Sequence, residues 1–275
     1  MSEEKTKNGL YYTSLIRNIV ILVIVVSFTP MFLVSGIILY QFRDSYREKI
    51  HDHLGELVLN HKQNIDTFLQ EKLKHIRFLA KSYSFEELSD ESFLQEILFN
   101  LQEGFSPFFV DLGVINERGV QLAYVGPYKL GGAVYSEAVW FKESLQKPYY
   151  ISDVFLGLRG LPHFIIAVKE DWQGQPWILR ATIDFVAFNT LVESVRIGET
   201  GFAFIINRKG ECQTRPCLDM EYSKKVLADL LADRKNIARE INIAEKKDTS
   251  GKKNLYVASF LKEGDWLLVY QQAAS

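Results

Sequence analysis

The chain has 275 residues, a formal net charge of −2 and a pI near 6.2. This balance provides no basic surface of the kind that binds nucleic acid, so we expect no nucleic-acid partner. The two cysteines, Cys212 and Cys217, are too few for a structural zinc site, which takes four nitrogen or sulfur ligands. Their spacing leaves open whether they form a local disulfide or two free thiols.

Residues 19–40 are uncharged and almost wholly apolar, and charged residues flank them on both sides. Roughly 20 such residues in a helix cross a bilayer core of about 30 Å, and the run is too long for the core of a cleaved signal peptide. We therefore predict a cytoplasmic N-terminus (1–18) and a transmembrane helix (19–42). Lys and Arg counts near the two ends are similar and leave the orientation open. We expect a single-pass protein of the cell inner membrane, with residues 43–275 in the periplasm.

Residues 43–84 have the pattern of one long helix. Apolar residues recur every three or four positions between Ile50 and Leu79, with Gly55 as the single glycine up to Lys81. We predict a stalk helix, and because its apolar stripe is longer than one small module covers, we predict a homodimer that forms through it. The four histidines in this segment are read as solvated or interface positions rather than metal ligands; they are His51, His53, His61 and His75.

Beyond the stalk, a short helix is expected at 85–102, and short apolar runs then alternate with turns. The predicted strands cover 110–115, 121–125, 150–155, 164–169 and 177–184, with helices over 135–146 and 185–195. The segment 114–119 is echoed at 205–210, each an apolar strand followed by Asn, two polar residues and a turn glycine. A helix at 223–233 and strands at 238–244, 253–261 and 266–271 complete the second copy. The sequence thus predicts an α/β (α+β) fold with two tandem modules.

This order of elements resembles the double Cache domain of bacterial sensor histidine kinases and chemoreceptors. The resemblance rests on the segments 135–145, 148–154, 183–184, 198–204 and 265–270. It implies two PAS-like antiparallel-sheet modules, a membrane-distal one at 85–195 and a membrane-proximal one at 196–272. It also implies that the distal module binds a small molecule for transmembrane signalling.

The residues that would form such a site are aromatic and charged. We expect an apolar wall and a few polar groups, supplied by Tyr135, Trp140, Phe141, Tyr150, Asp153, Arg180 and Asp184. Amino-acid-binding members of the family usually carry an Arg two residues before the Trp, where this chain has Ala138. An α-amino acid is therefore in doubt. An amine held by the aspartates, or a carboxylate held by Arg180, remains open.

Each candidate also has a simpler interpretation. Trp140 can be a core anchor, Asp153 a turn cap, and Asp184 the cap of the helix that follows it. Arg159, between two glycines, can tip a hairpin, and His163, after a proline, is expected to be exposed.

We find no nucleophile elbow, phosphate loop, zinc-protease pair or nucleotide fingerprint, so we expect no enzyme, catalytic residue, cofactor or metal. No kinase or methyl-accepting segment precedes Ser275, so we expect the output domain to be absent from this chain. The prediction is a sensor input region, and the alternative is a membrane-tethered ligand-binding or scaffold protein without signalling output.

Overall fold

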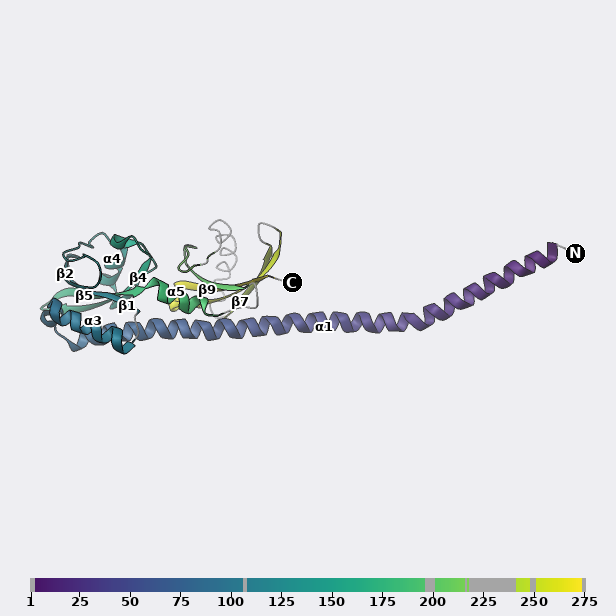
Figure 1. The fold of residues 1–275 in the computed structure, drawn as a ribbon, viewed down its shortest axis with the longest axis horizontal. Coiled ribbons are helices and arrows are strands. Elements are labelled where there is room, and N and C mark those ends of the chain that lie inside the picture. Colours follow the sequence, from purple (N-terminus) through teal and green to yellow (C-terminus); the bar gives the residue numbers. More distant parts are fainter. Residues whose placement is uncertain are drawn as a thin grey trace. The chain divides into compact units, whose positions relative to one another are not determined.

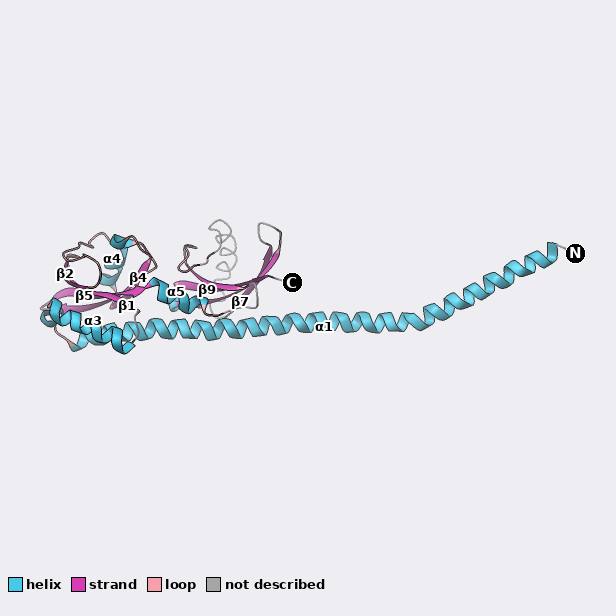
Figure 2. Cartoon of the chain, in the orientation of Figure 1, coloured by secondary structure: helices cyan, strands magenta, loops and turns pink. Residues whose placement is uncertain are grey.

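The computed structural model describes residues 3–105, 108–195, 201–215, 217, 241–247 and 251–273. The chain forms two compact units, Met1–His53 and Leu54–Ser275. Helix α1 (Glu3–Ser82) contributes to both units, and the second unit also contains two β-sheets (Figures 1 and 2). The mixed helical and antiparallel-sheet fold that the sequence predicts is therefore confirmed, including the unbroken long helix.

The apolar part of α1 exposes its side chains to the surroundings. Its large hydrophobic residues between Val20 and Phe42 are all about half exposed or more, which excludes a buried core helix. In the described part of the chain, this is the one helix that is long and apolar enough to cross a membrane. The unit fits a single-pass membrane protein.

The first sheet has five antiparallel strands in the order β2-β1-β5-β4-β3. Their bounds are β1 Phe109–Ile115, β2 Gln121–Val125, β3 Tyr149–Ile151, β4 His163–Trp172 and β5 Gln175–Asp184. Two short connections make the β1–β2 and β4–β5 hairpins. Because β1 lies next to β5, residues about 70 positions apart face each other across one strand pair, with Gly113 opposite Arg180.

Helices cover both faces of this sheet (Figure 1). On one face lie α1 and α3 (Glu91–Phe105), where the Phe68 ring packs edge-on against Phe108 at 4.7 Å and Gln102 donates to the Phe109 carbonyl at 2.8 Å. The short helix α2 (Phe85–Leu88) begins with a capping box at Ser84. On the other face lies α4 (Val139–Gln146). Coverage on both faces explains why β1 and β5 are almost entirely buried.

The second sheet has the order β6-β9-β8-β7. Its strands are β6 Phe202–Asn207, β7 Asn242–Lys247, β8 Lys253–Leu261 and β9 Trp266–Ala273, and α5 (Phe185–Glu193) leads towards it from β5. Two 3₁₀ turns, η1 (Gly157–Arg159) and η3 (Lys262–Gly264), complete the described elements. The predicted helix at 223–233, the start of the predicted strand at 238–244 and the segment 196–200 lie outside the described residues. The module bounds 85–195 and 196–272 stay a prediction.

Cys212 and Cys217 form a disulfide, with their Cα atoms 6.2 Å apart. Both sulfur-bearing side chains pack against the core of the second sheet. The sequence left open a disulfide or two free thiols, and the structure contains the disulfide.

Most of the apolar stripe of α1 is buried within the chain itself. Its members Leu54, Val58, Ile65, Phe68, Leu69, Leu73, Ile76 and Leu79 are at most 8% exposed, whereas Ile50 and Leu57 are partly exposed. Elements of both modules pack on this helix, as the contacts of Phe68 with Phe108 and of His61 with Tyr270 show. The stripe is therefore covered by the two modules together, and dimerisation through the stalk stays a prediction that an exposed stripe no longer supports.

His61 on the stalk is an interface residue rather than a solvated one. Its ring is 2% exposed, its Nδ1 lies 2.6 Å from the Tyr270 hydroxyl of β9, and its Nε2 lies 3.3 Å from the Leu191 carbonyl of α5. Burial lowers the pKa of His61, which keeps the ring neutral. This contact therefore joins the stalk to the second sheet without adding a charge.

Two elements are shorter than predicted because backbone groups pair elsewhere. The helix expected from residue 135 begins at Val139, since the Tyr135 amide donates to the Gly119 carbonyl at 2.7 Å and Ala138 is extended. The strand expected to reach residue 155 ends at Ile151. Beyond it, the amides of Val154 and Phe155 bond to Gln213 and His163 respectively.

Candidate functional site

A cavity of about 450 Å³ lies on the α4 face of the first sheet. The start of α4, β3 and β4 line it, together with β5 and the loops that precede α4 and follow β3. The lining residues used below are Val134, Tyr135, Val139, Trp140, Tyr150, Asp153, Leu158, Arg159, His163, Arg180 and Glu211. A mostly apolar cleft with a few polar groups is the usual form of a small-molecule site.

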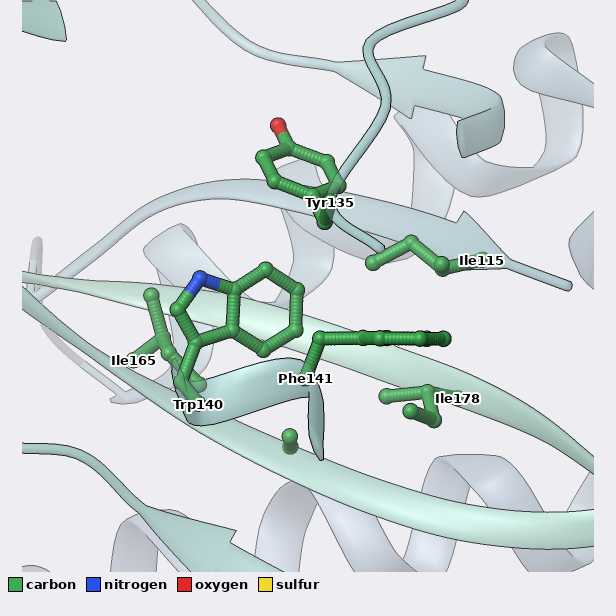
Figure 3. Close-up of a cluster of buried hydrophobic side chains, with 7 residues drawn as sticks. Ile115, Tyr135, Trp140, Phe141, Ile165 and Ile178 are labelled. Carbon is green, nitrogen blue, oxygen red and sulfur yellow. The ribbon is translucent and has the colours of Figure 1, made fainter. Parts of the chain in front are cut away.

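The apolar wall is aromatic and rigid. The Trp140 ring lies 5.0 Å from the Tyr135 ring and meets the Phe141 ring edge-on at 6.1 Å. Figure 3 shows these rings packed over Ile115, Ile165 and Ile178, which come from β1, β4 and β5. Trp140 is 6% exposed and packed within this cluster, so the wall is formed without a ligand.

Two arginines and one aspartate form the charged end of the site. Asp111 on β1 is fully buried, and its Oδ1 accepts from Arg180 Nη2 at 3.3 Å while its Oδ2 pairs with Arg159 Nη2. The Tyr124 hydroxyl donates to Asp111 Oδ2 at 3.1 Å, and Arg180 Nη1 donates to the Tyr135 hydroxyl at 3.2 Å. Both arginine side chains are 3% exposed. We call Asp111, Arg159 and Arg180 the charged cluster.

The strand register brings the charged cluster together. Thr182 lies opposite Asp111, and Arg180 lies opposite Gly113, so alternate residues of β1 and β5 point to the same face. A Cβ at Gly113 would lie 2.5 Å from the Gln121 amide oxygen and 3.3 Å from Arg180 Nη2. The glycine therefore leaves room for the Arg180 guanidinium to cross β1 and reach Asp111.

Arg159 reaches the cluster from the turn η1. Gly157, which opens the turn, has φ +54°, and a Cβ there would lie 2.8 Å from the Phe155 ring and 2.9 Å from the His163 ring. The turn directs Arg159 inward, where its guanidinium lies 4.8 Å from the centre of the Tyr128 ring and donates to the Thr182 hydroxyl. Burial lowers the pKa of Arg159, and the like charge of Arg180 acts in the same direction.

His163 is buried at the start of β4, which corrects the expectation that it is exposed. The ring is 5% exposed, lies 4.4 Å from the Phe155 ring, and its Nδ1 lies 2.8 Å from the Leu161 carbonyl. Since a carbonyl only accepts, Nδ1 carries the proton and Nε2 is left as an acceptor. Burial is the main reason why the pKa of His163 is lowered to about 4, and the charges of Arg159 and Arg180 contribute.

Asp153 connects the cavity to the second sheet. Its Oδ1 accepts from Trp266 Nε1 at 2.8 Å and lies 3.7 Å from Lys262 Nζ, while its Oδ2 accepts from Asn207 Nδ2 at 2.9 Å. The same Asn207 nitrogen donates to Glu211 at 2.7 Å. Both carboxylates of the lining are thus already engaged by donors.

The structure brings together five of the seven residues singled out from the sequence: Tyr135, Trp140, Tyr150, Asp153 and Arg180 line the cavity. Phe141 lies behind Trp140 in the supporting cluster. Asp184 is outside the lining; it is the N-cap of α5 and accepts from the Ala187 amide at 2.7 Å. The contact observed for Asp184 is therefore that of a helix cap.

Sequence reasoning missed Arg159, Asp111 and His163 as members of the site. A weak signal was present for Arg159, since a glycine on each side permits a turn that folds back over the sheet. For Asp111, the signal was a charged residue within an otherwise apolar strand, which requires a buried partner.

In the parts of the chain that the structure describes, no three His, Cys, Asp or Glu side chains cluster to hold a metal ion. The cavity also offers a cationic end rather than a set of metal ligands.

No protein-family model and no curated protein matches the sequence. Solved structures do match. The ligand-binding domain of the Pseudomonas fluorescens chemoreceptor CtaA, with L-isoleucine, is 15% identical with a TM-score of 0.62, covering 85% of this chain and 96% of that one. The ligand-binding domain of Pseudomonas aeruginosa PctB, with L-Arg, is 18% identical with a TM-score of 0.60, covering 82% and 96%. An extracellular domain assigned to a histidine kinase is 13% identical with a TM-score of 0.59, covering 82% and 97%.

The chain shares the fold of these chemoreceptor and histidine-kinase domains. This likeness confirms, at the level of fold, the resemblance to Cache domains that the order of segments indicates. Two of these three neighbours are ligand-binding domains of chemoreceptors, and the third is an extracellular domain assigned to a histidine kinase.

Proposed function

We propose that the chain is the membrane-anchored, extracytoplasmic sensing region of a transmembrane receptor, and that a small molecule binds in the cavity over the first sheet. In this proposal residues 1–18 are cytoplasmic and 19–42 cross the inner membrane. Residues 85–195 form the membrane-distal, ligand-binding module, and 196–272 form the membrane-proximal module.

The observation that carries the proposal is a preformed aromatic cavity with two buried guanidinium groups at one end. Buried charges are kept in proteins where they pair or bind, since an unpaired one costs several kcal/mol. The neighbouring domains CtaA and PctB have been solved with L-isoleucine and L-Arg respectively. We assign Tyr135, Trp140, Tyr150, Arg159 and Arg180 to the ligand site, with Phe141 as support and Asp184 as a cap.

Signalling requires that the cavity and the membrane-proximal module influence each other, and Asp153 provides a direct contact. It lines the cavity and accepts hydrogen bonds from Trp266 and Asn207 of the second sheet. A ligand that moves the loop after β3 alters these bonds. Such a connection supports a sensor over a tethered binding protein, which needs no coupling between its modules.

The test of binding is a thermal-shift screen of the full chain in nanodiscs against amino acids, amines and carboxylates. A ligand at 100 times its Kd raises the free energy of unfolding by about 2.7 kcal/mol. We expect the shift to disappear in Trp140→Leu and Arg180→Met, and to persist in Trp172→Leu, a tryptophan outside the cavity. A shift that survives both cavity variants would place the site elsewhere.

The test of coupling is the fluorescence of Trp266, obtained as the difference between the spectra of the chain and of Trp266→Phe so that Trp140 stays in the cavity wall, with a titratable ligand from the screen. Trp266 does not line the cavity, so a ligand changes its emission only through the protein. We expect a change on ligand addition that Asp153→Ala abolishes while binding remains. An emission spectrum that ligand leaves unchanged would argue against coupling by this route.

A further inference from the structure

We propose that the ligand of this cavity is an amphipathic anion without a partnering amine: a carboxylate-type head held by Arg159 and Arg180, with an apolar chain that runs towards the mouth. The inference rests on the proposed function, because it takes the cavity over the first sheet as the ligand site. It goes further by naming the chemical class of the ligand.

The head group follows from the charges of the cluster. Two guanidinium groups share one carboxylate, Asp111, so the cluster retains one uncompensated positive charge. The Nε atoms of both arginines are buried and have no hydrogen-bond partner among the described residues. Both arginines line the cavity. An anion at this end would supply acceptors and compensate the charge, and planar guanidinium groups are well matched to a carboxylate.

The absence of an amine follows from the acidic residues of the lining. Asp153 and Glu211 are the two carboxylates there, and both accept from Asn207, while Asp153 also accepts from Trp266 and pairs with Lys262. Asp111 is bound by both arginines and Tyr124. An ammonium group on the ligand would therefore enter beside excess positive charge and find no unengaged carboxylate in the described lining.

The apolar chain follows from the mouth of the cavity. Val134, Val139 and Leu158 line it, yet their side chains are 61%, 73% and 65% exposed. They come from three segments that meet here: the loop before α4, the first residue of α4, and η1. With Trp140 behind them, they form a continuous apolar path from the charged cluster outwards, which a hydrocarbon chain would cover.

The inference predicts a regular dependence of affinity on chain length. Each methylene buried along the path adds about 0.8 kcal/mol, an affinity gain of about fourfold, until the chain leaves the cavity. Acetate, butanoate, hexanoate and octanoate form the test series. Norleucine has the carbon skeleton of hexanoate with an added α-ammonium, hexylamine lacks the anion, and hexanol lacks the charge.

The experiment is calorimetric titration of these probes into the full chain in nanodiscs, with empty nanodiscs subtracted for partitioning into lipid. We expect affinity to rise from acetate to hexanoate, norleucine to bind at least about tenfold more weakly than hexanoate, and hexylamine not to bind. Arg180→Met should weaken every carboxylate. Val139→Ser should flatten the chain-length series and leave acetate unchanged, whereas Val186→Ser, at an equally exposed valine outside the lining, should change nothing.

Norleucine binding as tightly as hexanoate, or an affinity that does not vary with chain length, would overturn the inference. Val139→Ser concerns an exposed side chain, so the test does not depend on the folding of an Arg180 variant. If an amino acid binds and Trp140→Leu removes it, the proposed site stands and only the ligand class is wrong. If every ligand found binds equally to the cavity variants, the proposed function falls as well.

Discussion

Asp111→Asn is the sharpest test of the charged cluster, because it removes one charge and almost no volume. Asp111 is fully buried and is the carboxylate that pairs with both Arg159 and Arg180, whose side chains are 3% exposed. Removing one partner of a buried ion pair costs about 3–5 kcal/mol, since the remaining charge stays buried without compensation. In a domain of this size, each kcal/mol lowers the melting temperature by about 2–4 °C, so we expect a fall of about 6–20 °C.

The same variant should bind anions more tightly, because the uncompensated charge of the cluster rises from one to two. Thermal unfolding of the full chain, followed by tryptophan fluorescence with and without hexanoate, measures both effects. Glu137→Gln is the matched control: it makes the same chemical change at an exposed carboxylate that pairs only with Lys142, so no measurable shift is expected. A melting temperature of Asp111→Asn equal to that of Glu137→Gln would refute the claim that the Asp111 carboxylate stabilises the two buried arginines.

Asp184→Ala removes the acceptor of the Ala187 amide and should cost about 1 kcal/mol of stability without changing ligand affinity; a loss of affinity would return Asp184 to the site. The pKa of His163 is about 4 in the folded chain, against an ordinary value of 6.5 for a solvated histidine, so the unfolded chain binds more protons between these two values. Stability should therefore fall by about 3 kcal/mol as pH drops through this window, and His163→Gln should remove that part of the slope in denaturant titrations; parallel pH profiles would contradict this. Tyr270→Phe leaves His61 Nδ1 without its partner at 2.6 Å and should lower the free energy of unfolding by about 1–3 kcal/mol. Denaturant titration measures this effect, and an unchanged denaturation midpoint would contradict it.

The elements of this fold could be predicted from the sequence because they are governed by local periodicity. The uncharged run after residue 18 and the three-four spacing up to Leu79 both predict a helix, and α1 is continuous through them. The strand at 253–261 is found with the predicted bounds, since short β-branched and aromatic runs between turns are locally distinctive. Where prediction failed, as at Tyr135, a backbone amide had a partner distant in the sequence.

The partner of each apolar face was decided by tertiary structure. The apolar stripe on α1 predicts that one face of the helix is buried, but it does not identify the elements that pack against that face. In the structure, elements of the same chain cover it. The same limit applies to His61, whose partners Tyr270 and Leu191 are 209 and 130 residues away. Periodicity identifies a buried face because each apolar side chain on that face is itself favoured by burial. The partner of the face depends on how the rest of the chain folds, which no local pattern shows.

The candidate site shows the same division. Tyr135, Trp140 and Tyr150 could be chosen by residue type, because large aromatic side chains near turns are typical of ligand walls. The charged cluster could not, since Asp111 meets Arg180 only because β1 inserts beside β5 in the sheet, and Arg159 joins them only because η1 folds inward. A strand order of 2-1-5-4-3 brings together charges up to 69 residues apart, and no local pattern encodes that order.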